Sequence, residues 1–233
     1  MKSKLIVALD VSSKREAVKW AERLIKQTDL FKIGLQMLMS EGPSVVADIR
    51  KAGGRVFLDG KFHDIPSTVS RAVEAAGKSG AFMINVHCLG GLSMLEAAKS
   101  TAACSGQAAK PLVLGVTVLT SMDDRGLEEV GIRNSAKTQV VKLAKLAKKA
   151  GLDGVVASPL EIREIRKACG ENFIIVTPGI RAPGDAAGGQ KRTLSAREAV
   201  ESGADYIVVG RPILASKDPI ASAKMLVEEI SGL

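Results

Sequence analysis

The stretch Leu5-Ile6-Val7-Ala8-Leu9-Asp10 sets a pattern that recurs along the chain: a short apolar run that ends at a polar or charged residue. Strands of a parallel sheet have this composition, because helices cover both faces of such a sheet and bury every side chain. Seven further runs of the same kind follow. The eight expected strands cover residues 5–9, 30–33, 55–58, 82–86, 112–116, 154–157, 173–176 and 206–209.

Amphipathic segments alternate with these apolar runs, as expected for helices that cover a sheet. The expected helices cover residues 14–26, 44–51, 67–78, 92–102, 137–149, 160–167, 196–201 and 220–230. Glycine follows several of them, as is common at helix C-termini. These glycines are Gly53, Gly80, Gly151 and Gly203.

Eight strand–helix units in 233 residues, roughly 29 residues each, match the size of a βαβ repeat. They predict an α/β fold, a single-domain (β/α)8 TIM barrel over residues 1–233. A doubly wound sheet is the structural alternative, but it usually has fewer strands. Its Gly-x-Gly-x-x-Gly fingerprint does not follow the first run, and no P-loop sequence occurs.

Composition excludes several classes of protein. Hydrophobic residues make up 46% and charged residues 25% of the chain, which argues against a disordered or collagen-like polymer. No apolar run approaches the roughly 18 residues of a transmembrane helix, and the first residues lack a signal-peptide pattern. The scattered cysteines Cys88, Cys104 and Cys169 argue against a disulfide framework or a zinc site. We therefore expect a cytoplasmic protein without a metal site.

The net charge of +8 is compatible with a nucleic acid, an anionic membrane or a small anionic substrate as partner. The chain has only five Phe, one Trp and one Tyr, too few for a platform that stacks single-stranded bases. In the most basic stretch, residues 137–149, lysines recur at helical spacing opposite apolar residues, as on the solvated face of a core helix. We expect neither a nucleic acid nor a membrane as partner.

Charged residues lie at or just beyond the ends of the expected strands, where a TIM barrel carries its active site. They are Asp10, Lys32 and the pattern Asp59-x-Lys61-x-x-Asp64. In an extended chain, Asp59 and Lys61 would point to the same side. A lysine between carboxylates stays charged, which suits it to give a proton to a developing carbanion. The alternative interpretation is a structural ion-pair network at a strand end.

A second signal follows the last two expected strands, where the chain reads Thr177-Pro178-Gly179-Ile180-Arg181 and Gly210-Arg211-Pro212-Ile213. The corresponding loops of TIM barrels often hold a substrate phosphate. Glycine lets the backbone approach the anion, and arginine supplies charge-assisted donors. Residues 179–193 form a long, small-residue-rich segment that we interpret as a mobile lid. Residues 121–134 form a polar insert with a short helical stretch.

Together these signals resemble the orotidine 5′-monophosphate decarboxylase family, of the short bacterial type, along essentially the whole chain. The matching stretches are Ile6-Val7-Ala8-Leu9-Asp10, Phe31-Lys32-Ile33-Gly34, Phe57-Leu58-Asp59-Gly60-Lys61-Phe62-His63-Asp64-Ile65-Pro66, Val118-Leu119-Thr120-Ser121, Val176-Thr177-Pro178-Gly179-Ile180-Arg181 and Ile207-Val208-Val209-Gly210-Arg211-Pro212-Ile213. The third stretch is the most specific. Two positions depart from the family: Gly60 stands where a large apolar residue is usual, and Ser67 where asparagine is frequent. We expect Gly60 to loosen the loop that carries Lys61.

The resemblance implies a carboxy-lyase that converts orotidine 5′-monophosphate to uridine 5′-monophosphate, the last step of de novo pyrimidine nucleotide synthesis, without metal or cofactor. Lys61 would protonate C6 of the pyrimidine as carbon dioxide leaves. Asp59 and Asp64 would hold and charge this lysine, and Lys32 would complete the catalytic set.

The resemblance also implies the contacts to the substrate, including contacts to its phosphate. The implied substrate-binding residues are Asp10, Lys32, Asp59, Ile65, Thr68, Thr120, Arg181, Gln190, Gly210 and Arg211. Lys32 and Asp10 would bind ribose hydroxyls, and Thr120 would lie near the base. The phosphate would be held by Gln190 and Arg181 on the lid and by Gly210 and Arg211. Asp64, Ile65 and Thr68 would reach into the partner subunit's site, in a homodimer with shared active sites.

Two other functions share parts of the pattern. Magnesium-dependent ketogulonate-phosphate decarboxylases and hexulose-phosphate synthases also carry Asp-x-Lys-x-x-Asp. Their resemblance to one another implies a metal site with a glutamate at the end of the second strand, where this chain has Lys32. A lysine at that position would repel Mg²⁺. A non-catalytic nucleotide-binding barrel is the other alternative, because a fold alone does not establish activity. We interpret the isolated His63 and His87 as structural residues or as supports for neighbouring site residues, because the implied mechanism requires no histidine base.

Overall fold

Eight parallel strands close into a barrel in the order in which they occur along the chain. The computed structural model describes residues 4–103, 110–180 and 192–231. The strands are β1 Leu5–Ala8, β2 Leu30–Gly34, β3 Arg55–Phe62, β4 Met83–His87, β5 Leu112–Val116, β6 Gly154–Val156, β7 Ile174–Thr177 and β8 Tyr206–Val209. Each strand pairs with its neighbours in parallel, and β1 pairs with β8. The predicted (β/α)8 TIM barrel is confirmed.

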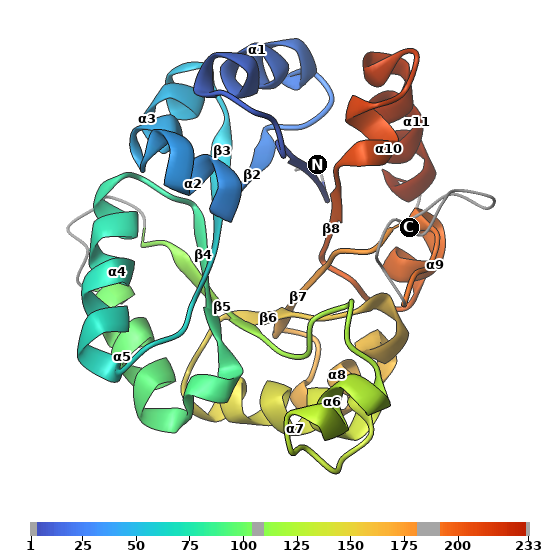
Figure 1. Cartoon of the computed structure of the whole chain (residues 1–233). Coiled ribbons are helices and arrows are strands. Elements are labelled where there is room, and N and C mark those ends of the chain that lie inside the picture. The colour runs from blue at the N-terminus through green and yellow to red at the C-terminus, as the bar shows by residue number, and fades with distance from the viewer. Residues whose placement is uncertain (1–3, 104–109, 181–191, 232–233) are drawn as a thin grey trace.

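Helices surround the ring of strands (Figure 1). They are α1 Lys14–Leu24, α2 Leu35–Glu41, α3 Ser44–Lys51, α4 Pro66–Lys78, α5 Leu92–Ala103, α6 Asp124–Glu129, α7 Ala136–Lys149, α8 Ile162–Cys169, α9 Ala196–Glu201, α10 Arg211–Leu214 and α11 Pro219–Ser231, with short 3-10 helices η1 Cys88–Gly90 and η2 Pro159–Glu161. The eight predicted helices are present, and α6 is the short helix expected in the polar insert. The sequence analysis missed α2, because this helix follows β2 without a loop and its N-cap, Gly34, has no capping side chain.

Alternation along the strands divides the apolar side chains into two layers. In β1, Leu5 and Val7 pack in the large cluster under the helices, whereas Ile6 and Ala8 join a smaller cluster. The smaller cluster fills the barrel interior with Ile6, Ala8, Leu30, Phe57, Met83, Leu114, Val176 and Val208. The strands are therefore apolar on both faces, as their continuous runs predicted.

Helix α7 confirms the interpretation of the basic stretch as one face of a core helix. Its buried residues include Leu143 and Ala147, whereas Lys142, Lys145 and Lys148 are exposed. No helix in the described ranges is long and apolar enough to cross a membrane.

A buried ion pair ties together three loops at the carboxyl end of the barrel. Arg192, just before α9, donates from Nη1 to Glu161 Oε1 in η2 at 2.6 Å. Its Nη2 donates to the carbonyl oxygens of Val118 and Leu119, after β5, at 3.4 and 3.2 Å. Arg192 and Glu161 are only 7% and 4% exposed, so each charge depends on the other for compensation.

We expect Arg192→Ala to lower the free energy of unfolding by about 3–5 kcal/mol, because it leaves the Glu161 carboxylate buried without a counter-charge. Urea unfolding measures this loss. The double variant Arg192→Met/Glu161→Leu should regain most of it, since neither charge is then buried alone.

Arg125→Ala is the matched control for this arginine. It removes an exposed pair with Glu129, and the expected cost is below about 1 kcal/mol. A loss in Arg192→Ala no larger than in this control would contradict the structural role of the buried pair.

Candidate active site

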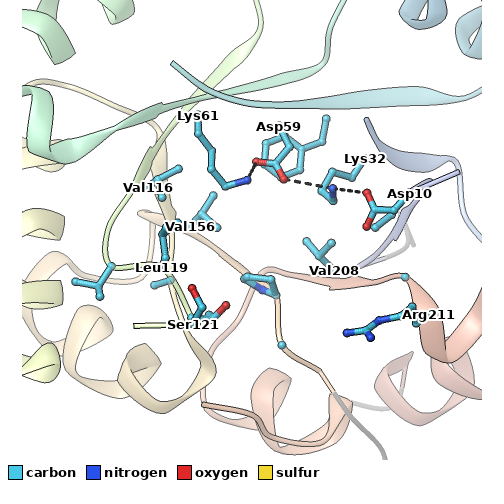
Figure 2. A pocket seen from close by; sticks show the side chains of 18 residues that line it. Asp10, Lys32, Asp59, Lys61, Val116, Leu119, Ser121, Val156, Val208 and Arg211 are labelled. Atoms are coloured by element: carbon cyan, nitrogen blue, oxygen red, sulfur yellow. Dashed lines mark hydrogen bonds and ion pairs between the residues drawn. The ribbon is translucent and has the colours of Figure 1, made fainter. Parts of the chain in front are cut away.

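A cavity of about 340 Å³ opens at the carboxyl ends of the strands. Its lining residues are Ala8, Asp10, Lys32, Phe57, Asp59, Lys61, Val116, Val118, Leu119, Thr120, Ser121, Val156, Ala157, Pro178, Gly179, Val208, Gly210 and Arg211. Figure 2 shows Asp10, Lys32, Asp59 and Lys61 in a row along one side, with Arg211 across the cavity from Lys61. A concave, partly apolar site with a few converging charged groups is typical of small-molecule binding.

The strand pattern explains why charged side chains reach this cavity. Leu30 and Phe57 point into the barrel, so the next inward positions on their strands are Lys32 and Asp59. Lys32 pairs in register with Ala8 of β1 and Phe57 of β3. The inward side chains are therefore apolar toward the amino ends of the strands and charged at the level of Lys32 and Asp59.

In the row from Asp10 to Lys61, acidic and basic side chains alternate and form successive ion pairs. Lys32 Nζ lies 3.1 Å from Asp10 Oδ1 and 3.3 Å from Asp59 Oδ2. The other oxygen of Asp59, Oδ1, accepts a hydrogen bond from Lys61 Nζ at 2.7 Å. The Asp59 carboxylate therefore lies between two ammonium groups.

Burial and charge act in opposite directions on these groups. Burial acts to raise the pKa of Asp59, but the charges of Lys32 and Lys61, with hydrogen bonds from Lys61 and Asn85, bring it below its ordinary value of 3.8. Burial acts to lower the pKa of Lys32, but Asp59 and Asp10 raise it above 10.5. Both groups are charged at neutral pH.

The backbone around Lys61 departs from the extended chain that we expected. Lys61 has φ of 47°, in the left-handed region that residues with a Cβ atom rarely adopt. The β3–β4 pairing is also irregular between Leu58 and Phe62. Asp59 and Lys61 still meet, but through this irregular backbone rather than by simple alternation.

Asn85 is a component of the site that sequence reasoning missed. It is fully buried on β4, accepts a hydrogen bond from the Lys61 backbone N–H and donates one to Asp59 Oδ1, both at 2.7 Å. The available signal was a single amide residue within the otherwise apolar run 82–86.

The Phe62 ring occupies the space beside Gly60. A Cβ atom on Gly60 would lie 2.7 Å from Phe62 Cε1, which is closer than atoms pack. Gly60 is itself buried, and β3 continues through it to Phe62. The neighbouring ring thus fills the volume that a larger residue at position 60 would take, and the loosening expected from Gly60 stays a prediction.

The opposite side of the cavity is built from the ends of β7 and β8. Gly179 has φ of 82°, a conformation that favours glycine, and Gly210 precedes the short helix α10, which Arg211 begins. Thr120, from the loop after β5, lies on the same lining.

The cavity brings together seven of the residues that the sequence predicted for the site. They are Asp10, Lys32, Asp59, Lys61, Thr120, Gly210 and Arg211. Asp64, Ile65 and Thr68 do not line it; they are exposed, and Asp64 and Ile65 line a separate groove. Arg181 and Gln190, with most of the expected lid, lie outside the described residues.

The two histidines form a stack beside the site, with ring centroids 5.2 Å apart. Burial, then the nearby His63 and Lys61, lower the pKa of His87 to about 4, so His87 is neutral at pH 7. Neither ring lines the cavity, which agrees with a structural role. Among the residues that the structure describes, no three or more His, Cys, Asp or Glu side chains gather as a metal site would require.

Comparisons with known proteins agree with this arrangement. A model of the family described as "Orotidine 5′-phosphate decarboxylase / HUMPS family" matches residues 3–226. The orotidine 5′-phosphate decarboxylase of Trichlorobacter lovleyi is 47% identical over 230 residues, covering 98% of this chain and 95% of the relative. That of Moorella thermoacetica is 48% identical over 234 residues, covering 98% and 92%.

The crystal structure of orotidine 5′-phosphate decarboxylase from Lactobacillus acidophilus superposes with a TM-score of 0.87 at 36% identity, covering 98% of this chain and 99% of that one. Sequence, fold and the position of the cavity thus lead to one assignment. The chain belongs to the orotidine 5′-phosphate decarboxylase / HUMPS family.

Proposed function

We propose that this protein decarboxylates orotidine 5′-monophosphate to uridine 5′-monophosphate, in pyrimidine nucleotide synthesis, with Lys61 as the proton donor and with no metal or cofactor. The observation that carries the proposal is the Lys61 ammonium, held against Asp59 at 2.7 Å in the cavity of a barrel of this family.

The reaction breaks the bond between C6 and the carboxylate carbon, and the electron pair of that bond stays on C6. A localised carbanion of this kind needs a positive charge that is already in place, because an ammonium fixed in a poorly solvated cavity needs no reorganisation. Nζ of Lys61 then gives its proton to C6 as carbon dioxide leaves. The apolar Val116 and Val156 on the same lining reduce solvation of that charge.

The remaining residues orient the nucleotide. Asp10 and Lys32 are proposed to bind the ribose hydroxyls, with Thr120 near the base. Gly210 and Arg211 are proposed to bind the phosphate, together with Arg181 and Gln190. Phosphate binding energy realised far from C6 serves to orient the base against Lys61.

Lys32 favours this reaction over the magnesium-dependent alternative. Its ammonium lies within 3.3 Å of both Asp10 and Asp59, the carboxylates that a cation at this end of the barrel would need. A divalent ion bound there would have to displace the Lys32 ammonium, whose positive charge is already paired with those two carboxylates.

The direct test follows the fall in ultraviolet absorbance as orotidine 5′-monophosphate is consumed. We expect the same rate in EDTA and in added Mg²⁺, because no step uses a metal. Lys61→Ala, purified in parallel, controls for contaminating enzyme. Activity lost in EDTA and restored by Mg²⁺ would support the alternative, and no absorbance change in either condition would refute the proposed reaction.

We further propose that the active protein is a homodimer whose sites are shared. Within one chain, Asp64 accepts a hydrogen bond from the N–H of Ile65 at 2.6 Å and lies outside the cavity that contains Lys61. Ile65 is 64% and Leu89 46% exposed, so the groove beside Asp64 presents apolar surface suited to a second copy of the chain. Asp64, Ile65 and Thr68 of one subunit would then complete the partner's site.

Mixing two inactive variants tests this arrangement. Lys61→Ala and Asp64→Asn chains, unfolded together and refolded, should form about half mixed dimers, each with one intact site of two. We therefore expect about a quarter of wild-type specific activity. Mass spectrometry confirms that subunits have exchanged.

A mixture of Lys61→Ala with Asp59→Asn is the matched control. Both residues line the cavity of the same chain, so every site in every dimer keeps a defect and no activity should return. If the Asp64→Asn mixture also stays at the level of its parents, the shared site is ruled out.

A further inference from the structure

We infer that Asn85 is a positioning residue: it holds the Lys61 backbone and the Asp59 carboxylate in the arrangement that aims the lysine ammonium into the cavity. The inference rests on the proposed role of Lys61. Asn85 does not line the cavity, so it acts through the two residues that do.

The pairing of β3 with β4 shows why a side chain is needed at this point. Leu58 pairs with Ile84, and the next pair is Phe62 with Val86. Three residues of β3 therefore lie opposite a single residue of β4, which is Asn85. Extra residues of this kind bend a strand and redirect its side chains, and they recur beside active sites. They also remove ladder hydrogen bonds, so the backbone groups need other partners.

The Asn85 side chain supplies such a partner. The backbone N–H of Lys61 donates to Asn85 Oδ1 at 2.7 Å. Lys61 is the one non-glycine residue with positive φ in the part of the chain that the structure describes. A left-handed lysine is intrinsically unfavourable and persists only where surrounding contacts impose it. The hydrogen bond to Asn85 is one such contact, formed at the residue that carries the strain.

The other end of the same amide fixes Asp59. Asn85 Nδ2 donates to Asp59 Oδ1 at 2.7 Å, and the same oxygen accepts from Lys61 Nζ, also at 2.7 Å. The contacts form a closed cycle that runs from the Lys61 backbone through Asn85 and Asp59 to the Lys61 side chain. Asparagine offers a carbonyl acceptor and an NH2 donor group without a charge. An aspartate would repel Asp59, and an aliphatic residue would contact neither partner through hydrogen bonds.

Asn85→Leu tests the inference, because it keeps similar volume and removes both hydrogen bonds. We expect kcat for orotidine 5′-monophosphate to fall about 100-fold, as for a small misplacement of a reacting group. The dissociation constant for uridine 5′-monophosphate should change less than about threefold, because the phosphate and ribose contacts remain. Asn85→Asp is the second variant, in case Asn85→Leu does not fold. It retains an acceptor for the Lys61 N–H but places a negative charge against Asp59, so kcat should fall in it as well.

Two controls separate positioning from loss of stability. Ile84→Ala removes a fully buried side chain from the outward face of the same strand and should lower the melting temperature while kcat is kept. Asn134→Leu makes the same chemical change far from the cavity, at a residue bonded to the buried Gln139 and to Lys142. It should also lower the melting temperature and leave kcat unchanged.

A kcat within about threefold of wild type in both Asn85 variants, with Lys61→Ala inactive, would overturn this inference and leave the role of Lys61 intact. Loss of nucleotide binding in proportion to kcat would also overturn it, because Asn85 would then support the whole pocket. If Lys61→Ala itself kept full turnover, the proposed function of Lys61 would fail instead.

Discussion

Burial of the Asp59 carboxylate at the top of the barrel is tolerated because two ammonium groups, those of Lys32 and Lys61, lie 3.3 and 2.7 Å from its oxygens. An isolated carboxylate in this position would take up a proton. The paired carboxylate keeps its pKa below 3.8, and the same attraction keeps the pKa of Lys32 above 10.5. The depressed pKa of Asp59 stabilises the folded chain above pH 3.8 and ceases to do so as the pH falls below it. The raised pKa of Lys32 stabilises it below pH 10.5 and ceases to do so above that value.

The fold supplies the geometry that this charge arrangement requires. Inward positions of β1 to β3 are apolar up to Ala8, Leu30 and Phe57, and the next inward positions on β2 and β3 are Lys32 and Asp59. The closed barrel brings the ends of β7 and β8 to the opposite side of the same cavity. A ligand with an anionic end and a reacting end can therefore span from Arg211 to Lys61. Ion pairs within the chain already hold Lys32, Asp59 and Lys61 in place, so binding at the anionic end can be used to orient the reacting end.

Much of this architecture could be predicted from the sequence, because burial on both faces gives parallel strands a continuous apolar pattern. That pattern located all eight strands, and residues at or just beyond the strand ends include the charged row of Asp10, Lys32, Asp59 and Lys61. Other features depend on contacts between distant segments. Arg192 and Glu161 are 31 residues apart, and no local sequence pattern around either residue predicts that the two form an ion pair. The left-handed backbone of Lys61 arises where three residues of β3 lie opposite the single residue Asn85 of β4. The sequence of β3 alone does not show this mismatch.

The central claim is that the Lys61 ammonium stabilises negative charge at C6 and exchanges a proton with it. Proton transfer to C6 must also run in reverse, so the enzyme should remove the C6 proton of the product nucleotide. The direct measurement is proton NMR of uridine 5′-monophosphate incubated with a high concentration of enzyme in D₂O. The account predicts that the C6 proton signal decays with the wild-type protein and persists with Lys61→Ala. Equal decay with both proteins, or no decay with a wild-type preparation that decarboxylates orotidine 5′-monophosphate, would contradict the account.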